Sequence, residues 1–71
     1  MSGFRALPSV DQLLSGHPDL IDRHGRAMVT RHARLRLDAA RAAIRDGADG
    51  TVEAARLPHL LAADLAAMAA T

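Results

Sequence analysis

The chain contains no cysteine, no lysine, no tryptophan and no tyrosine, and Phe4 is the only phenylalanine. Without cysteine, neither a disulfide framework nor a thiolate metal site can form. Without lysine, no Schiff base to an aldehyde cofactor can form within this chain. With one aromatic side chain, composition disfavours a site that stacks several bases on aromatic rings.

Long apolar runs are also missing. His59 and Asp64 interrupt the best candidate for a membrane span, and the first nine residues lack the apolar segment of a signal peptide. We therefore expect a cytoplasmic protein with no membrane partner.

Candidate metal and catalytic residues are weak. The four histidines show no H-x-x-x-H spacing, and zinc sites without cysteine usually need closely set ligands: His17, His24, His32 and His59. Ser9, Thr30 and Thr51 have no persuasive His/Asp partners in the sequence, and a small core does not favour a dry, preorganised pocket. We expect no metal site, no bound cofactor and no catalytic residue in this chain.

The length of 71 residues allows one small domain or a piece of a larger protein. Residues 1–8 are interpreted as a flexible N-terminal arm, and residues 9–71 as a helical domain. Ser9 to Gln12 has the S-x-x-Q form of a capping box, which predicts a short helix ending at Gly16. Pro18 then suits the first position of a second short helix that ends at Gly25.

A long helix is predicted over residues 26–46. At about 100° per residue, five side chains fall within an arc of about 80° and predict its core face: Val29, Ala33, Leu37, Ala40 and Ile44. A second, weaker apolar strip implies another contact, within this chain or with a different one: Met28, Leu35, Ala39 and Ala42. Arg36 lies at the edge of the core face, where its side chain must pair or extend into solvent.

The C-terminal part begins with a loop at residues 47–50, followed by Thr51 as the expected N-cap. Pro58 either starts a new helix or kinks the existing one. Leucines from Leu57 onward recur at helical spacing, which predicts an amphipathic helix to about Ala69. The predicted fold is all-α, a small bundle of about four helices organised around the long central helix.

The long helix also concentrates positive charge. From Gly25 to Gly47, six arginines against two aspartates give +4, whereas the flanking segments carry −1 and −2. A stripe at about 120–200° from Val29 is our candidate phosphate-binding surface: Arg31, Arg34, Arg41 and Arg45. It extends over about 21 Å, which suits a nucleic-acid backbone better than one small anion. Arg26 and Arg36 are second choices.

Three motifs in order resemble a known family. Residues 5–14 read RALPSVDQLL, similar to the opening L-P-[SA]-[VI]-D-x-L-L of bacterial selenocysteine synthase, L-seryl-tRNA(Sec) selenium transferase. Residues 20–26, LIDRHGR, resemble the family's aromatic-or-His–Gly turn. The family's V…R…LD…R…IR.G pattern then follows in register: Val29, Arg34, Leu37, Asp38, Arg41, Ile44, Arg45 and Gly47.

The resemblance implies a tRNA-recognition domain. In the family, a small helical domain binds the body of tRNA(Sec), chiefly its D-arm, and precedes a catalytic domain that uses pyridoxal phosphate. The full-length enzyme forms a homo-oligomer and converts seryl-tRNA(Sec) to selenocysteinyl-tRNA(Sec). This chain contains neither the cofactor domain nor its lysine, so we expect no chemistry from it alone. The alternative is a non-catalytic protein–protein interaction module that docks on another subunit.

Overall fold

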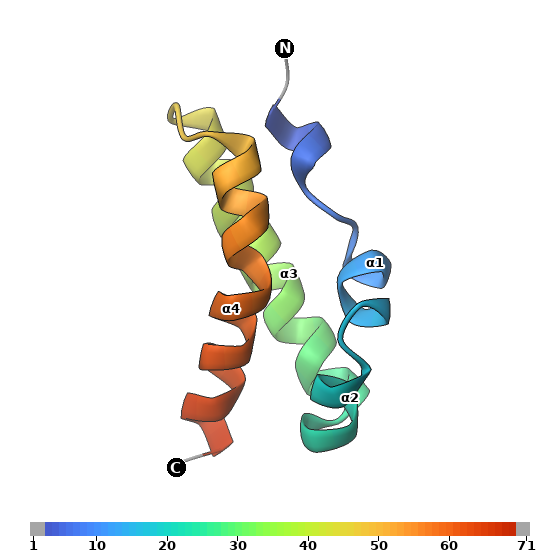
Figure 1. The fold of residues 1–71 in the computed structure, drawn as a ribbon. Coiled ribbons are helices and arrows are strands. Elements are labelled where there is room, and N and C mark those ends of the chain that lie inside the picture. The colour runs from blue at the N-terminus through green and yellow to red at the C-terminus, as the bar shows by residue number, and fades with distance from the viewer. Residues whose placement is uncertain (1–2, 70–71) are drawn as a thin grey trace.

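The computed structural model describes residues 3–69, and every regular element in this range is a helix. A 3-10 helix, η1 (Gly3–Ala6), precedes four α-helices: α1 (Val10–Ser15), α2 (Pro18–His24), α3 (Arg26–Arg45) and α4 (Gly50–Ala69). The two long helices, α3 and α4, form an antiparallel pair, and the N-terminal elements line one side of it (Figure 1). Because α3 contacts all the other elements, the predicted all-α bundle around a central helix is confirmed.

Part of the expected N-terminal arm is helical. η1 contacts both α4 and α3, and the half-buried Leu7 packs against Leu37, Ala40 and Leu57. Residues 3–8 therefore lie against the two long helices, while residues 1 and 2 of that arm lie outside the described part of the chain.

Local signals set the ends of the short helices. The Gln12 backbone N–H donates to Ser9 Oγ at 3.1 Å, and the Ser9 backbone N–H donates to Gln12 Oε1 at 2.9 Å. These two bonds confirm the predicted capping box at the start of α1. Gly25, with a φ of 85°, separates α2 from α3 in a conformation that costs glycine little and other residues more. Its backbone N–H donates to the carbonyl of Ile21, which ends α2.

The start of α4 corrects one expectation. The helix begins at Gly50, and its first backbone N–H groups are capped by Asp49, not by Thr51. Asp49 Oδ1 accepts from the backbone N–H of Thr51 at 2.8 Å and from that of Val52 at 3.3 Å. An aspartate is a better N-cap than a threonine, and its charge also suits the positive end of the helix dipole.

Pro58 lies inside α4 and does not start a new helix. Its ring nitrogen cannot donate to the carbonyl of Ala54, one turn earlier, so one bond of the helical ladder is missing. The ribbon of α4 changes direction near its middle (Figure 1), as expected where a proline interrupts the ladder. One bent helix therefore supplies leucines to both ends of the core.

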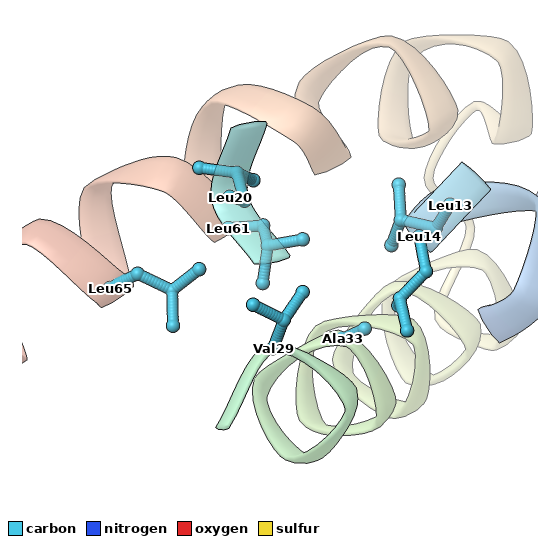
Figure 2. Close-up of a cluster of buried hydrophobic side chains, with 7 residues drawn as sticks. All are labelled: Leu13, Leu14, Leu20, Val29, Ala33, Leu61 and Leu65. Carbon is cyan, nitrogen blue, oxygen red and sulfur yellow. The ribbon is translucent and has the colours of Figure 1, made fainter. Parts of the chain in front are cut away.

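The core consists of two clusters along the α3–α4 pair. The larger brings together all four α-helices: Leu13, Leu14, Leu20, Val29, Ala33, Leu61 and Leu65. Figure 2 shows Leu61 and Leu65 extending from α4 toward Val29 of α3. The smaller cluster contains Leu37, Ala40 and Leu57. The predicted core face of α3 is thus confirmed, with Ile44 half-buried at its end.

Candidate nucleic-acid interface

Four arginines share the solvent-facing side of α3. Burial of Val29, Ala33, Leu37 and Ala40 fixes the rotation of this helix in the bundle. These four buried side chains form one arc of the helix surface. The residues at about 120–200° from Val29 lie about 80–160° from the middle of this arc, so they must face away from the core. The structure confirms their exposure: Arg31, Arg34, Arg41 and Arg45 are all solvent-accessible. We call these four residues the arginine stripe.

Most of the arginine stripe carries uncompensated charge. Within residues 3–69, no ion pair involves Arg31, Arg34 or Arg45. Arg41 Nη1 donates to Asp38 Oδ1 at 3.1 Å, but both side chains are largely exposed. Such a surface pair is worth little and uses one of the five N–H donors of a guanidinium. All four stripe guanidinium groups therefore have donors available for phosphate oxygens.

Arg36 has a different role from the stripe. Its Nε donates to Asp64 Oδ2 at 2.5 Å, and its Nη2 donates to Asp64 Oδ1 at 2.6 Å. This fork links α3 to α4, and the side chains of the two residues are only 33% and 27% exposed. Of the two outcomes expected for Arg36, pairing or extension into solvent, the structure shows pairing.

The hydrogen bonds from Arg36 lower the pKa of Asp64 below 3.8, its ordinary value, and partial burial opposes this effect. The same bonds raise the pKa of Arg36, again against the effect of burial. Since both shifts favour the charged forms, the pair is ionised across the neutral range. The positive charge of Arg36 is therefore neutralised by Asp64 and does not add to that of the arginine stripe.

Arg26, the other second choice, is also separate from the stripe. It is the first residue of α3 and is exposed. On the helical wheel it lies about 60° from Val29, over the arc of the core face, whereas the stripe occupies about 120–200°. The structure therefore brings together the four first-choice arginines and places Arg26 and Arg36 elsewhere.

Sequence reasoning did not assign partners to two charged residues of α4. Asp64 binds Arg36, and Arg56 Nη1 donates to Glu53 Oε2 at 3.4 Å. A signal for the first pair was present: Arg36 has no acidic residue three or four positions away on its own helix. A half-buried arginine of this kind either extends into solvent or pairs with a carboxylate from another element. Arg36 and Arg56 both line a hollow between α3 and α4, and the charge of each is compensated by its carboxylate partner.

Histidines and acidic residues do not converge on a common point. In the part of the chain that the structure describes, no group of three His, Cys, Asp or Glu side chains could hold a metal ion. His17 is half-buried, and its Nδ1 donates to the carbonyl oxygen of Leu13 at 2.9 Å.

Across residues 3–69, no helix is both long enough and apolar enough to cross a membrane.

The ion pair between Arg36 and Asp64 predicts that the free energy of unfolding depends on pH. Because the folded-state pKa of Asp64 is depressed, its contribution to the free energy of unfolding is present above pH 3.8 and is lost as the pH falls through the lowered pKa. Asp64→Asn should lower that free energy by about 0.5–1 kcal/mol near neutral pH, since the pair is partly exposed. The difference from the wild type should shrink in acid.

Thermal unfolding of both proteins between about pH 2 and pH 7 measures this difference. The matched control is Asp22→Asn, on an exposed residue that forms no ion pair within residues 3–69, and it should give a small difference at every pH. Equal stability of Asp64→Asn and the wild type at neutral pH would contradict the prediction.

Together, the fold and the charge distribution define a small all-α domain with an arginine-bearing face. The family model for the N-terminal part of selenocysteine synthase matches residues 4–41. The chain therefore belongs to the selenocysteine synthase N-terminal family, which associates it with selenocysteine synthesis. No curated protein and no solved structure gives a significant match.

Proposed function

We propose that this chain is the tRNA(Sec)-recognition domain of an L-seryl-tRNA(Sec) selenium transferase. The observation that supports this most directly is the row of exposed arginines on α3, in a chain whose family takes part in selenocysteine synthesis. The substrate of that synthesis is carried on a tRNA, and guanidinium groups are well suited to bind the phosphates of RNA.

In this proposal the arginine stripe contacts the tRNA backbone. From Arg31 to Arg45 the stripe covers about 21 Å, the length of several base-pair steps of a duplex. Charged side chains on a rigid helix keep a fixed spacing, so they bind best to phosphates that are arranged with the same spacing. Recognition therefore depends on the shape of the RNA, because phosphate contacts carry no base sequence.

The chemistry of selenium transfer lies outside this role. The resemblance assigns pyridoxal phosphate to a separate domain of the full-length enzyme, and that cofactor is held by a lysine. This chain has no lysine, so its own residues do not fit the cofactor. The domain would bind the tRNA and present its seryl end to the cofactor domain, in an enzyme that acts as a homo-oligomer.

A binding titration tests the proposal. The 71-residue chain is mixed with unmodified tRNA(Sec) over a series of salt concentrations, and tRNA(Ser), which shares the amino acid but not the tRNA shape, serves as the competitor. We expect the logarithm of the affinity to fall linearly with the logarithm of salt, with a slope of about −3 to −4 from four backbone contacts. Equal affinity for both RNAs would contradict shape recognition, and no binding at low salt would contradict the proposal altogether.

A further inference from the structure

A second apolar strip on α3 is left exposed by residues 3–69. Met28 is 37% exposed and Leu35 is 56% exposed, and the neighbouring Ala39 and Ala42 are also exposed. We call these four residues the apolar strip. Most exposed apolar side chains on small domains are scattered singly, whereas these four follow one line along one helix.

The spacing of the apolar strip is that of a helix–helix seam. Met28, Leu35 and Ala42 are seven residues apart, so they recur every second turn on nearly the same side of α3. The strip is centred about 200° around the axis from the middle of the core face. The other helices cover the core face of α3, and α4 borders the strip at Ala39, which lines the hollow between α3 and α4. Met28, Leu35 and Ala42 stay exposed, so a second helix can approach the strip along these three residues.

We propose that the apolar strip is the contact by which two copies of this chain associate, with their α3 helices antiparallel about a two-fold axis near Leu35. In this arrangement the two Leu35 side chains meet at the centre. Met28 of one copy lies opposite Ala42 of the other, because both are seven residues from Leu35. A large side chain therefore faces a small one at each end, and alanines allow the two helix axes to come close.

Charges along one edge of the strip favour this register. Arg31 lies four residues before Leu35 and Asp38 three residues after it, and both lie on the same edge, at about 200° and 180° from Val29. In an antiparallel pair related by a two-fold axis, the same edges meet. Arg31 of each copy therefore lies opposite Asp38 of the other, which gives two ion pairs, and the antiparallel helix dipoles also attract.

Asp38 is available for this exchange, since its side chain is 73% exposed and its contact with Arg41 lies at the surface. In a parallel pair related by a two-fold axis, opposite edges of the two strips would meet, so Arg31 of one copy would not lie opposite Asp38 of the other. The association uses Arg31, one of the four residues of the arginine stripe, whereas Arg34, Arg41 and Arg45 lie further from the strip and keep their donors for phosphates.

Sedimentation equilibrium without RNA tests the association, using the 71-residue chain from micromolar to about 1 mM. We expect a monomer–dimer equilibrium. Leu35→Glu should raise the dimer dissociation constant at least about tenfold, because it places two carboxylates at the apolar centre. Val52→Glu is the matched control: Val52 is 52% exposed but lies on α4, so its dissociation constant should match the wild type. A monomeric wild type, or equal effects of the two variants, would overturn the proposal.

A charge exchange tests the register. Arg31→Asp and Asp38→Arg, made singly, should each weaken the dimer about threefold or more, because each creates two like-charged contacts. The double variant restores two opposite-charge contacts and should return to the wild-type dissociation constant. If the double variant is as weak as the singles, the antiparallel register is wrong. The folded state of every variant is checked by its helical circular dichroism.

Discussion

Replacing Arg34 and Arg41 together by glutamate is expected to weaken tRNA(Sec) binding about a hundredfold. The slope of log affinity against log salt should become less steep, by the contribution of about two phosphate contacts. Both side chains belong to the arginine stripe and are exposed, so the substitutions leave the core unchanged. Each charge-assisted bond to a phosphate is worth about 1.5 kcal/mol or more, and the introduced carboxylates add repulsion. Arg34 forms no ion pair among the described residues, and Arg41 has only a surface one.

A gel-shift titration at several salt concentrations measures both effects. The matched control is Arg5→Glu with Arg23→Glu, which changes the net charge equally at two exposed positions outside α3. The control should lose much less affinity than the stripe variant, because only the long-range attraction changes. Wild-type affinity in the stripe variant would mean that the arginines only solvate this face. Equal losses in both variants would mean that net charge alone drives binding.

Replacing Leu61 by alanine is expected to have the largest effect on the fold. Leu61 is fully buried on α4 and belongs to the cluster that joins all four α-helices (Figure 2). Removing a buried leucine side chain costs about 2–5 kcal/mol, through lost transfer energy and the cavity left behind. A chain of this length has a small stability reserve, so this one change is expected to populate the unfolded state without denaturant.

Urea unfolding followed by helical circular dichroism measures the cost. Leu35→Ala is the matched control, because it removes the same atoms from a leucine that is 56% exposed on α3. In dilute solution, where the chain is monomeric, it should change the free energy of unfolding by about 0.5 kcal/mol or less. Similar losses for both variants would mean that the core cluster does not dominate stability.

Much of the fold follows from local patterns. Three features depend only on residues that are close in the sequence, so they can be predicted without tertiary information: the S-x-x-Q capping box, the helix end at Gly25 and the 3.6-residue period of α3. The same period placed the four stripe arginines on one exposed face, as the structure confirms. The start of α4 was predicted two residues late, because Asp49 and Thr51 are both N-cap residues and only the path of the loop selects between them.

Other features depend on contacts between distant residues. The position of Arg36 allowed two outcomes, pairing or extension into solvent. Only the crossing of α3 and α4 brings Asp64, 28 residues along the chain, within hydrogen-bond distance. Likewise, the sequence predicted two apolar strips on α3 without deciding what covers each of them. Packing of α1, α2 and α4 covers the core face of α3 and leaves the apolar strip exposed.

The sequence by itself thus determined the helices, the phase of α3 and the grouping of its charges, because these depend on spacing along one helix. The tertiary structure decided which arginines retain free donors and which apolar strip stays exposed. Those outcomes depend on which helix lies beside each face of α3, and that arrangement is set by the core as a whole.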